Sequence, residues 1–183
     1  MHYRVIEPHA DDAFLSLGGH IKRWIADGHH VEIVTVYATQ KRAAEAKAYA
    51  DSVGAAYQWL GYIEAGSMDK APEPIDYLPP MDGWVTICPL GLRHEEHYAV
   101  RKAYENGRGS TDVLWYYVDQ PYAMQLKNQE DLSAKMAGKE VVSVFKPGGR
   151  KYHKNTVALF KTQSLFFYYN KDALPYTIEM IIS

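Results

Sequence analysis

The sequence predicts an α/β fold in which helices flank a mostly parallel β-sheet. Two observations predict this class. Short segments rich in β-branched residues alternate with longer segments whose apolar residues recur at helical spacing. The composition is that of an ordinary globular protein, with 47% hydrophobic and 23% charged residues in a chain of 183. This length suits one hydrophobic core, so we expect a single domain over residues 1–183.

The first half of the chain begins with a short strand over Tyr3–Glu7. Apolar residues then recur at helical spacing over residues 14–25, and the Asp27-Gly28 pair supplies a helix stop. The segment Val31–Tyr37, which reads VEIVTVY, is the clearest strand of the chain because it is rich in β-branched residues.

The next two elements repeat this pattern. Residues Gln40–Val53 are rich in alanine and predict a helix that ends at Gly54, and Ala56–Leu60 predicts a third strand. Strand, helix, strand, helix and strand in succession are typical of a parallel sheet with right-handed crossovers.

A segment rich in proline and glycine, Gly61–Gly83, predicts a long surface loop with at most one helical turn. Beyond it we expect a strand over Trp84–Cys88, a helix over Glu95–Tyr104 and a strand over Val113–Val118. The five strands then form a Rossmann-like sheet in the order 3-2-1-4-5.

The pattern weakens beyond Pro121. Residues 155–163 are compatible with a helix, and the final TIEMII is compatible with either a helix or a strand. No internal repeat or low-complexity tract interrupts the sequence.

Charge and cysteine content exclude several classes of protein. The formal charge of −2 gives no general attraction to nucleic acid or to an anionic membrane. Cys88 is the only cysteine, which excludes an intrachain disulfide and a cysteine-based zinc site. Four acidic residues within the first thirty exclude a signal peptide there, and no apolar run reaches the ~20 residues that a membrane span needs. We therefore expect a cytoplasmic protein without a membrane span.

Histidines and carboxylates follow two of the predicted strands. His9, Asp11 and Asp12 come directly after the first strand, and His94 and His97 come after the fourth. In the order 3-2-1-4-5 these strands are neighbours, and their outgoing loops open the crevice where such sheets bind ligands. Mixed imidazole and carboxylate ligands suit zinc or a similar divalent ion. The alternatives are a helix N-cap for the aspartates and solvent-exposed histidines.

The residues around these positions resemble one enzyme family. The stretch PHADDAFLSLGG (residues 8–19) is similar to the opening His-Pro-Asp-Asp-Glu motif of the PIG-L/LmbE-like N-deacetylases, and HEEH (94–97) resembles their His-Pro-Asp-His. Two weaker similarities are RAAEAKAYADSVGA (42–55), which matches an Arg-x-x-Glu helix, and KNTVALFKTQS (154–164) near the C-terminus. The resemblance covers most of the chain in the same order.

The resemblance implies a role for each of these residues. His9, Asp12 and His97 hold the metal, which is Zn²⁺ or another divalent ion such as Fe²⁺. Asp11 is the general base. His94 stabilises the oxyanion of the tetrahedral intermediate, and we expect a carboxylate to keep it cationic.

The chain departs from the family at several positions. Ala10 replaces the usual proline, and Ala13 replaces a glutamate that would add a carboxylate to the site. Glu96 replaces the aspartate that orients the first histidine, and its longer side chain could still reach. Arg42 lies where the family places a substrate-binding arginine, and we expect Glu45 to hold it; the alternative is a solvated ion pair.

The predicted function is hydrolysis of the N-acetyl group of a small amino sugar or its conjugate. The basic segment Lys139–Lys161 would suit a phosphorylated or nucleotide-linked substrate. One alternative is a degenerate relative that binds metal or ligand without turnover. A nucleotide-binding Rossmann domain is disfavoured because the first loop lacks Gly-x-Gly-x-x-Gly and carries two carboxylates. The aromatic SLFFYYNK (164–171) suggests a homo-oligomer interface.

Overall fold

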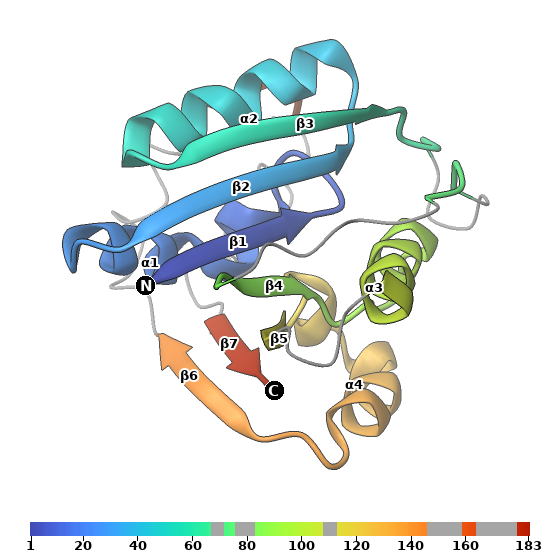
Figure 1. The fold of residues 1–183 in the computed structure, drawn as a ribbon. Helices are drawn as coiled ribbons and strands as arrows, with labels where there is room; N and C mark the ends of the chain where they lie inside the picture. The colour runs from blue at the N-terminus through green and yellow to red at the C-terminus, as the bar shows by residue number, and fades with distance from the viewer. Residues whose placement is uncertain (67–71, 76–82, 108–112, 146–158, 164–178) are drawn as a thin grey trace.

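A β-sheet, with seven strands in the described part of the chain, forms the centre of the computed structural model (Figure 1). The structure describes residues 1–66, 72–75, 83–107, 113–145, 159–163 and 179–183. The strand order is β3-β2-β1-β4-β5-β7-β6. The strands are β1 (His2–Glu7), β2 (His30–Tyr37), β3 (Ala56–Tyr62), β4 (Val85–Pro89), β5 (Val113–Tyr117), β6 (Val141–Phe145) and β7 (Glu179–Ile182).

The predicted class and the order of the first five strands are confirmed. Strands β1 to β5 pair in parallel. The prediction was incomplete beyond them, because β7 adds antiparallel to β5, and β6 adds antiparallel to β7. The final TIEMII, which left two alternatives open, contains the strand β7.

Within the described residues, four α-helices accompany the sheet: α1 (Asp12–Ala26), α2 (Gln40–Val53), α3 (Glu95–Gly107) and α4 (Gln129–Met136). The bounds of α2 are those that the sequence predicts. Thr39 accepts a hydrogen bond from the Arg42 N–H at its start, and Gly54 ends it with a left-handed φ of 85°. None of the helices in the described part of the chain is long and apolar enough to cross a membrane.

The two faces of the sheet carry separate hydrophobic cores. Along β1, Val5 packs into a core with Phe14 and Leu17 of α1, whereas Ile6 packs into a second core with Val100 of α3. This alternation is what the period-2 geometry of a strand dictates. Helices α1 and α3 therefore cover opposite faces. The arrowheads of β1, β2 and β3 point toward the same side of the molecule, where α3 also lies (Figure 1).

Several predictions concern residues beyond the described ranges. Most of the basic segment 139–161 and all of the aromatic segment 164–171 lie outside the described residues. Much of the expected loop 61–83 also lies outside the described residues. At its start, β3 continues two residues farther than predicted, to Tyr62. Of the expected helix over 155–163, the described part contains a short 3₁₀ helix at Lys161–Gln163.

Gly19 allows β6 to lie close to α1. A Cβ atom at this position would lie 2.1 Å from the ring of Phe145, well inside contact distance. We expect Gly19→Ala to lower the free energy of unfolding by about 1–2 kcal/mol, because overpacking outweighs the gain in helix propensity of about 1 kcal/mol. Urea denaturation measures this change, with Arg23→Ala on the exposed face of α1 as control. An unchanged or raised stability would contradict the close contact.

Candidate metal centre

The five predicted site residues lie at the ends of two adjacent parallel strands. Strand β1 leads through a tight turn into α1, which places His9, Asp11 and Asp12 at its carboxyl end. Strand β4 pairs directly with β1 and leads into α3, which carries His97, with His94 just before its first residue. All five are buried, each with at most 8% of its surface exposed. The predicted convergence at the crevice of the sheet is therefore present.

Three of these side chains point donor atoms at one another. His9 Nδ1 lies 3.3 Å from Asp12 Oδ2, His97 Nε2 lies 3.2 Å from the same oxygen, and the two nitrogens are 3.3 Å apart. Ligands at about 2.0–2.2 Å from a tetrahedral zinc ion are about 3.3–3.6 Å from one another. The His9–Asp12–His97 cluster therefore fits a divalent ion both in its atom types and in its spacing.

The charges in this cluster are strongly coupled. Burial acts to lower the pKa of His97, but Asp12 and Asp119 raise it to about 10. Burial acts to raise the pKa of Asp12, but His97 and His9 hold it well below its usual range. The Asp12 carboxylate is therefore ionised, and the His97 imidazolium supplies positive charge that balances it. A divalent cation would take over that role on binding.

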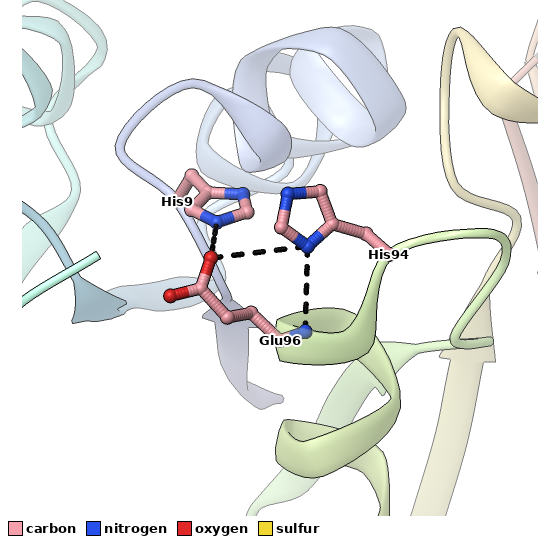
Figure 2. Close-up of side chains that lie close together, drawn as sticks. All are labelled: His9, His94 and Glu96. Carbon is pink, nitrogen blue, oxygen red and sulfur yellow. Dashed lines mark hydrogen bonds and ion pairs between the residues drawn. The ribbon is translucent and has the colours of Figure 1, made fainter. Parts of the chain in front are cut away.

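A second cluster, His9 with His94 and Glu96, also brings possible ligand atoms together (Figure 2). His9 Nε2 and Glu96 Oε2 are only 2.6 Å apart, which is a hydrogen-bond distance and too short for two ligands of a common ion. His94 Nδ1 already accepts a hydrogen bond from the Glu96 backbone N–H, at 3.3 Å. The contacts in this second cluster are better explained as hydrogen bonds that support the His9–Asp12–His97 cluster.

Glu96 holds His9 in the orientation that a metal ligand needs. Its Oε2 atom pairs with His9 Nε2, which leaves Nδ1 facing Asp12 and His97. Such carboxylate–imidazole pairs fix the tautomer and the ring orientation of metal-binding histidines. The other oxygen, Oε1, accepts the Ala65 N–H at 2.7 Å, so Glu96 also anchors the segment that follows β3.

The expectation of a cationic His94 is wrong. Burial, followed by the nearby His9 and His97, lowers the pKa of His94 to about 4. The carboxylate expected to keep it protonated, Glu96, is 3.8 Å away and pairs with His9 instead. His94 is therefore a neutral imidazole. Because Nδ1 accepts the Glu96 N–H, the ring proton is on Nε2, which is then available as a donor.

Asp119 is a buried carboxylate of the site that the sequence pattern did not predict. It follows β5, and its Oδ1 pairs with His97 Nδ1 at 2.5 Å. Its Oδ2 accepts the backbone N–H groups of Gly91 and Leu92, at 3.0 and 3.2 Å. Asp119 therefore orients His97 and holds the loop before α3. An acidic residue directly after the fifth predicted strand was the signal that could have identified it.

Arg42 approaches the site but is paired differently from the prediction. Its guanidinium bonds to Asp11 Oδ1 at 2.9 Å and to Glu64. Glu45, the expected partner, instead accepts the backbone N–H of Thr162 at 3.0 Å. Burial raises the pKa of Asp11, while Arg42 acts in the opposite direction. Asp11 thus combines a raised pKa with a position next to the metal cluster, as a general base requires.

Ala13, where the family usually has glutamate, is fully buried, and a different carboxyl group lies beside it. The Ala13 N–H donates to Glu7 Oε2 at 2.9 Å, and the Thr35 hydroxyl donates to Glu7 Oε1 at 2.5 Å. Burial raises the pKa of Glu7 to about 8. Glu7, at the end of β1, therefore stabilises the turn that carries the first motif.

No protein-family model matches the sequence, and no curated protein matches it. Solved structures are similar over the whole length. A triple mutant of the deacetylase in the teicoplanin biosynthetic pathway matches with a TM-score of 0.68 and 19% identity, and the zinc-inhibited form of teicoplanin deacetylase Orf2 matches with 0.66 and 16%. Each match covers 100% of this chain and 97% of the other. The chain has the fold of these deacetylases.

A third match extends this deacetylase fold to another enzyme. The A40926 pseudoaglycone deacetylase Dbv21 matches with a TM-score of 0.61 and 16% identity, over 98% of this chain and 95% of the other. The likeness to deacetylases that the two histidine motifs predicted is therefore confirmed at the level of the fold.

Proposed function

We propose that this protein is a member of the PIG-L/LmbE-like family and a metal-dependent hydrolase that removes an N-acetyl group from a small amino sugar or its conjugate. The observation that carries the proposal is the His9–Asp12–His97 cluster, whose three donor atoms lie 3.2–3.3 Å apart on a deacetylase fold. Asp11 and His94 stand beside it, as the resemblance implies.

The metal ion supplies Lewis-acid activation of a water molecule and of the amide carbonyl when it is bound. Zn²⁺ is our first choice, and Fe²⁺ is the alternative. Asp11 is not a member of the metal cluster, so its carboxylate is available to accept the proton of the attacking water and to return it to the leaving amine. Burial, which raises its pKa, brings this group closer to the pH at which it must exchange protons.

His94 is proposed to donate a hydrogen bond to the developing oxyanion from the N–H at Nε2. The neutral ring is suited to this because the backbone N–H of Glu96 fixes the tautomer before substrate arrives. A preorganised donor stabilises the transition state more than the ground state, because negative charge develops on the carbonyl oxygen only during the reaction. The alkaline loss of activity that a cationic His94 would cause is not expected.

A cavity beside His94 offers space for the substrate. Its volume is about 290 Å³, and its lining includes Tyr98 of α3 and Asp131 and Lys135 of α4. Charged and hydroxyl groups in the wall suit a ligand with several hydroxyl groups, and the size suits a small sugar. Arg42, which pairs with Asp11, is proposed to contact the substrate when this pairing opens.

Acetate release from N-acetylated amino sugars tests the proposal, with His94→Ala as the variant that separates an enzyme from a metal binder. We expect this variant to release acetate about 10²–10³-fold more slowly, the usual cost of one oxyanion donor, while its metal content is unchanged. Turnover and metal content per chain are measured on the same preparations, with Zn²⁺ and Fe²⁺ added separately.

Each other outcome has a distinct meaning. If His94→Ala loses the metal, the His9–His94–Glu96 cluster is the ion site, and the roles of His94 and His97 are exchanged. A wild-type protein that binds one ion but releases no acetate from any substrate would support the degenerate relative instead. An unchanged rate in His94→Ala would show that the second motif has no part in catalysis.

A further inference from the structure

A second group of reactive side chains lies farther along α1 from the metal cluster. His20 of α1 is positioned between Ser143 of β6 and Glu179 of β7. The His20 Nε2 atom lies 3.0 Å from Ser143 Oγ, and its Nδ1 atom lies 3.0 Å from Glu179 Oε2. His20 is eight residues beyond Asp12, which corresponds to about 12 Å along a helix. The two groups therefore share a helix but no residue.

The hydrogen bonds around Glu179 determine the orientation of His20. The carboxylate is fully buried and accepts the backbone N–H groups of Gly19 and His20, at 2.8 and 3.0 Å. Since it acts as an acceptor there, the His20 Nδ1 atom next to it carries the proton and donates to it. The Nε2 atom is then an acceptor, and it faces the hydroxyl of Ser143.

This order of groups is the one that activates a serine nucleophile. A hydroxyl bonds to the Nε2 atom of a histidine, and a buried carboxylate holds the Nδ1 proton. Glu179 and His20 are buried, with 0% and 2% of their surfaces exposed, whereas Ser143 is partly exposed on the edge strand β6. The base is thus largely enclosed by protein, and the nucleophile beside it is accessible.

We propose that Ser143, His20 and Glu179 form a nucleophilic site that reacts with esters of apolar acids. Ser143 Oγ attacks the ester carbonyl carbon while its proton moves to His20 Nε2. The bond to the alkoxy oxygen then breaks, and the alcohol leaves with that proton. Water, deprotonated by the same nitrogen, hydrolyses the acyl-serine to the acid and restores the hydroxyl, so that no other reactant is needed.

The apolar preference follows from the rings around His20. Phe145 lies two residues beyond Ser143 on the same strand, and its ring centroid is 5.7 Å from that of His20. The ring of Trp24, one turn along α1, lies 5.5 Å from His20 on its own helix. Aromatic rings favour an apolar acyl or aryl group over a charged one.

A fluorophosphonate with an alkyl chain is the probe that tests this site on the intact protein. Ser143 Oγ forms a bond to phosphorus, fluoride leaves, and His20 takes up the hydroxyl proton. We expect one covalent adduct per chain, located at Ser143 by mass spectrometry of peptides. Ser52 is the internal control, because it is exposed but donates its hydroxyl to the Tyr49 carbonyl at 2.7 Å. Ser143 should react about 10²-fold faster or more, the contribution of a general base.

Two variants complete the test. Ser143→Ala should lose the adduct while it retains acetate release at the metal site, which makes the result independent of the proposed deacetylase activity. His20→Gln should slow labelling of Ser143 about 10²-fold in protein whose circular dichroism is unchanged. If His20→Gln does not fold, the comparison of Ser143 with Ser52 still decides. No adduct at Ser143, or equal labelling of the two serines, would overturn the proposal. The three side chains would then only hold α1 against β6 and β7 by hydrogen bonds.

Discussion

Replacing His97 by alanine is expected to abolish stoichiometric metal binding. Loss of a residue that only supports a ligand typically costs 10–100-fold in metal affinity, so loss of the ligand itself should cost more than about 100-fold. The substitution also removes the imidazole that pairs with the carboxylates of both Asp12 and Asp119. Metal analysis of purified protein after dialysis, together with titration of the metal-free form, measures the loss.

His30→Ala is the matched control for this experiment. His30 is exposed at the amino end of β2, so it presents an imidazole that cannot join the cluster at the carboxyl ends of the strands. Its removal should leave metal content near one ion per chain. Equal metal content in His97→Ala and the control would show that the His9–Asp12–His97 cluster is not the binding site.

Asp11→Asn should retain the metal and lose about 10²–10⁴-fold in acetate release. The amide has nearly the same shape as the carboxylate but cannot accept a proton, and general-base catalysis typically contributes this factor. The measurement is turnover at saturating substrate in protein with one ion per chain. Near-normal turnover would require another base. Glu96 would then be examined first, although both of its oxygens already accept hydrogen bonds.

Glu64→Gln separates the loss of the base from the loss of an ion pair. Arg42 bridges Asp11 and Glu64, so removing either carboxylate weakens the same guanidinium contact. Only Asp11→Asn also removes the proposed base. We expect Glu64→Gln to lower turnover by less than about tenfold. A loss of turnover as large as that of Asp11→Asn would indicate that activity depends on the position of Arg42 rather than on proton transfer by Asp11.

The accuracy of the fold prediction depended on burial. Strand β2 is buried along most of its length, so its β-branched residues were constrained to a clear pattern. By contrast, β6 is an edge strand with exposed valines at 141, 142 and 144, and α4 has no fully buried residue. Neither needs a strong apolar pattern in the sequence, because neither buries a complete face. Their absence from the prediction has this physical cause.

Those residues of the candidate site that belong to a short sequence motif could be predicted from the sequence. The side chains of His9 and His97 lie together because β1 and β4 are adjacent, which the strand order already implied. Asp119 was not predicted, because its role depends on contacts across β5 and the loop before α3. The prediction that Glu45 pairs with Arg42 was wrong for a similar reason. Tertiary carboxylates compete for a guanidinium, and helical spacing alone does not reveal them.

The arrangement of Glu96 and Asp119 has a consequence for assembly. Each carboxylate holds one of the two histidines on the side of the ring away from Asp12, so that both rings face Asp12. The proposed ligands are thus oriented by the sheet and its hydrogen bonds, and we expect the hydrophobic core to form without the free energy of coordination. In small zinc-dependent domains the ion and the fold form together. We therefore expect a chelator to remove the ion from this site without unfolding the protein.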